Sequence, residues 1–241
     1  MLRLAALFAL LLPQVALASI CTTSQFENIL FTACEVQLGE DLRLFHSGPN
    51  GPLRSFDAIN SQLAAEGKQR GFAMNAGMYH ADRAPVGLFI EQGREQSELI
   101  TREGPGNFGL LPNGVFCIGD RFAVIESRSF GETQPACTYA TQSGPMLVQA
   151  GVLHPRLIPD SDSTYIRNGV GVSADGSRAV FVISNDRVNF HRFARLFRDG
   201  LDLPDALYFD GKISRLHAPA IGRSDVGFAM GPMVGTVVNK D

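Results

Sequence analysis

Short apolar runs alternate with clusters of small and polar residues along most of this chain. Residues 72–74 and 86–90 have the length and composition of buried strands, and residues 206–209 form a third such run after Pro204. The polar residues therefore fall mainly at strand ends and in the connections between strands.

Two pairs of runs predict β-hairpins. Residues 115–118 and 121–125 flank Gly119-Asp120, which predicts a hairpin with a two-residue turn. Residues 170–173 and 178–184 flank a four-residue turn sequence and predict a second hairpin.

Two segments have helical spacing. Ser55 is a candidate N-cap, and Gly67 or Gly71 would end the helix that follows it. Asn189 is the candidate N-cap of a second helix. The apolar positions of the two helices are Phe56, Ile59 and Leu63 in the first, and Phe190, Phe193, Ala194 and Phe197 in the second. Because hairpins outnumber strand-helix-strand units, we expect an α+β fold, a single domain of antiparallel or mixed β-sheet with packed helices.

The first residues are typical of an export signal. Residues 2–18 are almost entirely apolar, carry one cation at Arg3 and end in an A-x-A cleavage pattern at residues 16–18. Pro13 interrupts a run that is already short for a membrane span, and Ile20 stands where a lipoprotein would have a small residue before Cys21. We therefore predict a signal peptide at residues 1–18, a single domain at 19–241, no stable membrane anchor, and a secreted or periplasmic protein.

Charge narrows the range of partners. The chain has a formal charge of −3, and loss of Arg3 with the signal peptide would make it −3 − 1 = −4. Such a weak acidic balance, without a run of Lys or Arg, argues against nucleic acid as a partner.

The cysteine count predicts disulfide bonds. Four cysteines in an exported chain suggest two disulfides with three possible connectivities. Pairing Cys21 with Cys34 and Cys117 with Cys137 closes short loops and is favoured, although the sequence does not decide it. A zinc site is the weaker alternative, because the chain has no C-x-x-C pair.

The connection within residues 72–93 is the first candidate for chemistry. Asn75, Gly77, Tyr79, His80 and Asp82 lie between two apolar runs, where a rigid scaffold can hold a functional loop. An ordinary turn is the alternative, since Asn and Gly favour turns for backbone reasons alone.

Other polar groups stand in the same setting, each beside an apolar run: Ser143 and Gly144, Arg167 and Asn168, Asn185, and Asp210 and Gly211. A buried ion pair between Arg167 and Asp210 would be a purely structural explanation of these two residues. The sequence has no phosphate loop, nucleophile elbow or H-E-x-x-H motif. Asp160 and Asp162 do not form a recognisable metal cage, so we expect neither a cofactor nor a metal.

The motifs and their order resemble those of the phosphodiester glycosidase family, which includes the lysosomal uncovering enzyme. The resemblance runs from residue 72 to residue 214 through NAGMY and GLFIEQG, TQSGPMLV, RNGVGVSADG, VFVISND, FHRFARLF and ALYFDGKIS. It implies a hydrolase that acts on a sugar joined through its anomeric carbon to phosphate, and hence a small-molecule or glycan substrate that bears a phosphodiester.

The resemblance places the family motifs on Asn75 and Gly77, Ser143 and Gly144, Arg167, and Asp210 with Gly211. Asp210 is the candidate carboxylate for the oxocarbenium-like reaction, and Arg167 the candidate phosphate ligand. Asn75 is expected to join them in catalysis, and Asn168 and Asn185 could orient sugar groups with it. Tyr79 could form an apolar wall.

Two departures from the family pattern affect the expected pocket. Ala76, Met78 and Tyr79 replace its more frequent residues in the first motif, and Lys212 replaces a second glycine. An exported module that binds glycans or phosphoglycans without catalysis is the main alternative. A plain structural envelope protein is a third, and it predicts that Asn75, Arg167 and Asp210 lie far apart or are buried in separate contacts.

Overall fold

Three antiparallel sheets dominate the computed structural model, which describes residues 20–240. The first sheet has the strand order β1-β2-β15-β14-β16-β12-β13. Its strands are β1 Ile20–Phe26, β2 Ile29–Gln37, β15 Arg178–Ser184, β14 Asn168–Val172, β16 Asp205–Asp210, β12 Met146–Gln149 and β13 Val152–Leu153.

The other sheets are smaller. The second has the order β10-β9-β11-β7-β8, the third β18-β17-β6-β19-β3, and β4 pairs with β5. Their strands are β10 Phe122–Glu126, β9 Gly114–Ile118, β11 Tyr139–Ser143, β7 Phe89–Glu91, β8 Arg94–Ser97, β18 Arg223–Ser224, β17 Leu216–Ala218, β6 Lys68–Asn75, β19 Met233–Asn239, β3 Leu42–Phe45, β4 Ser47–Gly48 and β5 Gly51–Pro52.

One apolar core joins the three larger sheets. The ring of Phe181 on β15 lies 5.3 Å from that of Phe72 on β6 and 5.6 Å from that of Phe116 on β9, measured between centroids. All three side chains are buried. The broad α+β prediction is therefore confirmed, in a form that is rich in sheet.

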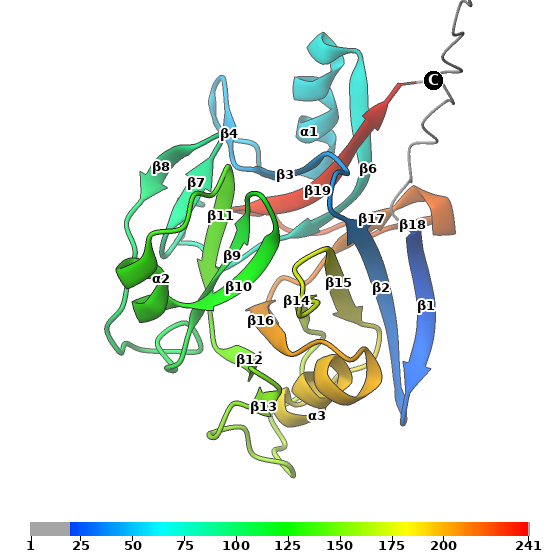
Figure 1. The fold of residues 1–241 in the computed structure, drawn as a ribbon. Helices are drawn as coiled ribbons and strands as arrows, with labels where there is room; N and C mark the ends of the chain where they lie inside the picture. The colour runs from blue at the N-terminus through cyan, green and yellow to red at the C-terminus, as the bar shows by residue number, and fades with distance from the viewer. Residues whose placement is uncertain (1–19, 241) are drawn as a thin grey trace, which may run out of the picture.

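Three short helices pack at the edges of the sheets, with α1 and α3 at opposite ends of the molecule (Figure 1). They are α1 Phe56–Leu63, α2 Ser127–Thr133 and α3 Phe190–Arg195. Short helical turns follow α1 at Ala64–Glu66 and α3 at Leu196–Gly200, and a third lies between β17 and β18 at Pro219–Ile221. Both predicted N-caps are confirmed. Ser55 Oγ accepts the N–H of Ala58 at 3.2 Å, and Asn189 Oδ1 accepts the N–H of Arg192 at 2.9 Å.

The two predicted hairpins form as β9-β10 and β14-β15. The first turn has three residues, not the two expected, because Phe122 pairs with Ile118. The strand expected at residues 86–90 begins only at Phe89. Val86 and Leu88 instead donate their N–H groups outside the ladder, to Met78 O and Gln142 Oε1.

Both favoured disulfides are present. Cys21 bonds Cys34 across β1 and β2, where the two residues face each other in the register. Cys117 on β9 bonds Cys137. The predicted signal peptide lies outside the described residues. Within residues 20–240, we find no helix with the length and apolar character needed to cross a membrane.

Candidate active site

A cleft opens where the end of β16, the start of β14 and the loop after β6 meet. Because β14 and β16 are antiparallel neighbours, with Asn168 opposite Asp210, the start of one strand lies beside the end of the other. The cleft has a volume of about 1250 Å³. Its lining residues are Met78, Tyr79, His80, Ala81, Arg83, Val86, Pro105, Gly106, Asn107, Phe108, Ser163, Tyr165, Arg167, Phe190, Tyr208, Asp210, Gly211, Lys212, Ile213, Phe228 and Ala229.

Asp210 supplies the one acidic side chain among the described residues that line the cleft. Its Oδ1 accepts the backbone N–H groups of Gly211 at 2.6 Å and Lys212 at 2.8 Å. Burial raises the pKa of Asp210, and the hydrogen bonds from these backbone groups oppose the rise. A third backbone hydrogen bond to this carboxylate, from Ile213, opposes the rise as well. A carboxylate of raised basicity suits proton transfer.

Arg167 forms the base of the cleft and is only 1% exposed. Its Nε donates to Val188 O at 2.8 Å, Nη1 to Tyr208 Oη at 3.3 Å and Nη2 to Ser163 O at 3.0 Å. A guanidinium has five N–H groups, so one on each terminal nitrogen has no acceptor among residues 20–240.

The surroundings of Arg167 are aromatic. Its guanidinium carbon lies 3.7 Å from the ring centroid of Phe190 and 5.3 Å from that of Tyr165, contacts that stabilise a cation. Burial lowers the pKa of Arg167. The ion pairs formed within residues 20–240 do not include a bridge between Arg167 and Asp210, so the purely structural explanation of these residues is wrong.

Asn75 and Asn168 form a buried amide pair behind the cleft. Asn75 Nδ2 donates to Asn168 Oδ1 at 3.2 Å, and Asn168 Nδ2 donates to Asn75 O at 2.8 Å. Asn75 Oδ1 accepts the N–H of Arg215 at 2.9 Å, and Ser214 Oγ lies 3.2 Å from Asn168 Oδ1, one of three acceptors within reach of its single proton. Both asparagines are 0% exposed and neither lines the cleft. The pair holds the 210–215 segment in place instead of presenting its amides to the cleft.

Gly77, Ser143 and Gly144 also lie behind the cleft surface. Gly77 has a φ of +92°, and a Cβ there would lie 2.9 Å from Thr141 Oγ1. Ser143 is fully buried, and its hydroxyl donates to Phe209 O at 3.2 Å. Ser143 thus holds the end of β16, and none of the three residues belongs to the lining.

Tyr79 and Gly211 do line the cleft. The hydroxyl of Tyr79 donates to Ala229 O at 3.3 Å, and burial, together with the nearby charge of Asp210, raises the pKa of Tyr79. A Cβ on Gly211 would collide with Tyr208 Oη. Glycine therefore allows the backbone to pass close to the Tyr208 hydroxyl and the Arg167 guanidinium.

Asn185 lies elsewhere. Its Oδ1 accepts Arg223 Nη1 at 2.6 Å, and its Nδ2 donates to Thr32 Oγ1 at 3.2 Å. Its amide is hydrogen-bonded to partners from β2 and β18, and it does not line the cleft. The expectation that Asn185 contacts substrate therefore has no support in this geometry.

Several lining residues were missed from the sequence. Tyr208 precedes Asp210 by two positions on one strand, so strand periodicity places both side chains on the same face and could have identified it. Arg83, Ser163 and Phe228 come from loops whose approach depends on long-range contacts, and no local signal marks them.

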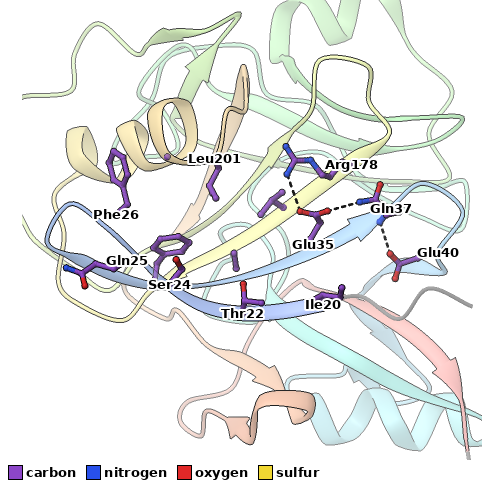
Figure 2. A pocket seen from close by; sticks show the side chains of 14 residues that line it. Ile20, Thr22, Ser24, Gln25, Phe26, Glu35, Gln37, Glu40, Arg178 and Leu201 are labelled. Atoms are coloured by element: carbon purple, nitrogen blue, oxygen red, sulfur yellow. Dashed lines mark hydrogen bonds and ion pairs between the residues drawn. The ribbon is translucent and has the colours of Figure 1, made fainter.

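A second, smaller pocket of about 610 Å³ lies over β1 and β2. Figure 2 shows Phe26 and Leu201 at its apolar part and the ion pair between Glu35 and Arg178, 3.1 Å apart, at its polar part. None of the predicted site residues lines it. Among the described residues, its lining has two carboxylates, Glu35 and Glu40, and one cation, Arg178, which is paired with Glu35.

The convergence of polar groups is confined to the larger cleft. Arg167 and Asp210 line it, and Asn75 is linked to both strands through Asn168. Arg167 and Asp210 thus do not lie far apart as a plain structural envelope protein would have them, whereas Asn75 is buried in separate contacts, as that alternative allows. Among residues 20–240, no group of three or more His, Cys, Asp or Glu side chains could hold a metal ion.

Known proteins resemble this chain in both sequence and fold. A protein of Escherichia coli (strain K12), the uncharacterized protein YigE, is 36% identical over 180 residues, which are 74% of this chain and 70% of that protein. The solved catalytic domain of zebrafish N-acetylglucosamine-1-phosphodiester alpha-N-acetylglucosaminidase, auto-inhibited by its pro-peptide, has a TM-score of 0.65 at 11% identity. That match covers 93% of this chain and 85% of the zebrafish chain, and at this identity it shows a shared fold. Residues 68–216 match the family model described as phosphodiester glycosidase, so the chain belongs to the phosphodiester glycosidase family.

Proposed function

We propose that the protein is an exported hydrolase that cleaves a sugar-1-phosphodiester between the anomeric carbon and the phosphate oxygen. The single observation that carries this proposal is the position of Asp210, one carboxylate with a raised pKa, in a cleft whose base is a guanidinium without an acidic partner. The two disulfides support an oxidising compartment.

Asp210 has the geometry for the sugar side of the reaction. As the bond from C1 to oxygen breaks, positive charge develops on the sugar, and a nearby carboxylate stabilises it. Water forms the new bond to C1, and Asp210 accepts its proton. The electron pair of the broken bond remains on the phosphate oxygen, so the products are the free sugar and a phosphate monoester.

Arg167 has the geometry for the phosphate side. Its two terminal nitrogens each retain one N–H group without a protein acceptor, which matches two oxygens of a phosphate. Phe190 and Tyr208 fix the plane of the guanidinium. The ligand would thus meet an oriented cation that needs no rearrangement.

The charge balance of the cleft agrees with this assignment. Glycosidases usually employ two carboxyl groups, one of which protonates the leaving group. Only Asp210 provides a carboxyl group in this lining, whereas Arg83, Arg167 and Lys212 provide cations. A phosphate monoester leaves without prior protonation, so one carboxylate is sufficient for such a substrate.

The direct test is sugar release from a panel of sugar-1-phosphate methyl esters that includes N-acetylglucosamine and glucose. We expect turnover by the purified full chain, and a loss on the order of 10²–10⁴-fold in kcat for Asp210→Asn. Arg167→Gln should raise KM, because the phosphate is held in the ground state, and lower kcat, because the negative charge on the leaving phosphate grows in the transition state.

Asp175→Asn is the matched control, because Asp175 caps the turn of the β14-β15 hairpin and does not line the cleft. Full activity of folded Asp210→Asn would refute the mechanism. Tight binding of the esters by wild type without any turnover would instead identify a glycan or phosphoglycan binding module.

A further inference from the structure

Arg215 has a guanidinium without any hydrogen-bond acceptor. Its Nε and Nη2 are buried and have no partner, and no hydrogen bond or ion pair joins its side chain to another group within residues 20–240. The fully buried guanidinium of Arg167 uses three of its N–H groups, whereas Arg215 is partly buried and uses none. Burying an unpaired cation destabilises a folded chain, so this arrangement requires an explanation.

The backbone of Arg215 is fixed although its side chain is not. Asn75 Oδ1 accepts its N–H at 2.9 Å, and the preceding residue, Ser214, donates through Oγ to Asp210 O at 3.0 Å. The amide pair behind the cleft therefore places Arg215 in a constant position relative to Asp210.

Arg215 lies behind the wall of the cleft formed by Tyr79 and the 227–229 segment. A Cβ on Gly227 would lie 3.5 Å from Arg215 Cδ and 3.6 Å from its Nη1. The next two residues, Phe228 and Ala229, line the cleft, as does Tyr79, whose hydroxyl bonds Ala229 O. Tyr79 and Asp225 are the groups whose charges act on Arg215.

The nearby carboxylate is already engaged. Asp225 forms an ion pair with Arg223 at 2.9 Å, and its Oδ2 also accepts the N–H of Leu216 at 2.9 Å. Burial lowers the pKa of Arg215, which is the direction expected when no anion compensates the charge.

The segment that covers Arg215 has few constraints. Val226 is 92% exposed and Phe228 is 79% exposed. Asp225 and Met230 anchor the two ends through backbone bonds to Leu216 O and Arg54 O, each 2.9 Å long. Between these anchors, residues 226–228 make no backbone hydrogen bond within the described chain. Such a segment can move at small cost.

We propose that Arg215 is a second anion-binding residue of this cleft, which donates to the phosphate of the substrate when residues 226–228 move aside. The inference rests on the proposed function for the identity of the anion. Arg167 would then hold the phosphate from the base of the cleft, and Arg215 from behind the Tyr79 wall.

The proposal differs from a structural role in what it predicts for stability. A guanidinium that supports the fold would leave the chain less stable when removed. A buried cation that awaits a ligand would leave the chain as stable as wild type, or more stable, when replaced by a neutral side chain of similar length.

The test compares Arg215→Met with Arg178→Met, in which an ion-paired arginine of the second pocket is removed. Binding of inorganic phosphate to the full chain is measured by calorimetry, with chloride at equal ionic strength as the reference. We expect Arg215→Met to bind phosphate at least tenfold more weakly than wild type and Arg178→Met to bind it equally well. Without ligand, Arg215→Met should have an unchanged or higher Tm.

Activity provides a separate readout. For a sugar-1-phosphate methyl ester, Arg215→Met should raise KM at least tenfold. Its kcat/KM for a p-nitrophenyl glycoside, which has no phosphate, should remain that of wild type if wild type cleaves it. If wild type binds phosphate but cleaves no ester, and Arg215→Met binds no phosphate, the anion site is supported and the proposed reaction is refuted. Equal phosphate binding by Arg215→Met and wild type, or no binding by wild type, would overturn the inference.

Discussion

The amide pair formed by Asn75 and Asn168 permits a quantitative test of how the site is held. In Asn75→Ala, the N–H of Arg215 loses its acceptor, at a cost of about 1–3 kcal/mol for a buried unsatisfied donor. Loss of the bond to Asn168 adds about 1 kcal/mol, a modest amount because Ser214 Oγ lies 3.2 Å from Asn168 Oδ1 and can turn its proton toward it. The free energy of unfolding should fall by about 2–4 kcal/mol, which for a chain of this size lowers Tm by roughly 5–15 °C.

The catalytic effect should exceed what this loss of stability explains. Asn75 lies outside the cleft lining but fixes the backbone at Arg215 and, through Asn168 and Ser214, the end of β16. A displacement of catalytic groups by about 1 Å can cost on the order of 10²-fold in rate. We therefore expect kcat/KM to fall by about 10²-fold at a temperature where the variant is fully folded.

Asn60→Ala is the matched control, because Asn60 Oδ1 also accepts a backbone N–H of an arginine at 2.9 Å, that of Arg70, beside α1 and away from the cleft. It should lose a comparable part of its stability in urea or thermal unfolding and keep its kcat/KM. Wild-type kinetics in folded Asn75→Ala, or equal kinetic losses in both variants, would refute the positioning role.

Three other outcomes follow from the described contacts. Because burial raises the pKa of Asp210, its ionised form opposes folding at neutral pH. Asp210→Asn should therefore raise Tm at pH 7 and lose this advantage near pH 3, where the carboxyl group is protonated in both the folded and the unfolded states. Replacing Cys117 and Cys137 by serine should lower the free energy of unfolding by about 3 kcal/mol in urea, and an unchanged denaturation midpoint would contradict this. Phe228→Ser should change stability by less than about 0.5 kcal/mol, because the side chain is 79% exposed, yet raise KM for esters with apolar aglycones; identical KM values would exclude a contact.

Local signals predicted much of the fold. Ser55 and Asn189 were recognisable as N-caps because their side chains bond N–H groups three residues later. The disulfide between Cys21 and Cys34 follows from the pairing of two adjacent strands. The order of the strands in the sheets was beyond reach, because it depends on long-range pairings, some of which, such as β2 with β15 and β6 with β19, join residues more than one hundred positions apart.

The residues of the candidate site were likewise predictable only where a local sequence signal marks them. Arg167 and Asp210 were identified because each stands at the end of an apolar strand, and the pairing of β14 with β16 brings the two ends together. Asn185 stands in an equivalent position at the end of β15, but Arg223, from a different sheet, occupies its amide. Arg215 could not be recognised at all, since its distinctive property is the absence of an acceptor in the folded chain.

The balance of charge also explains why the site is built from buried groups. Asp210 lies in a cleft that contains three cations, yet the effect of burial outweighs them and raises its pKa. Arg167 is buried without an acid that would compete with a ligand for its N–H groups. Each group alone would be better solvated in water, so both reduce the stability of the empty cleft. A substrate with a positively polarised sugar carbon next to an anionic phosphate would offset the charges of both Asp210 and Arg167. A neutral glycoside would offset only the charge of Asp210. The proposed preference for a phosphodiester would therefore arise because the empty cleft leaves both groups without a compensating charge.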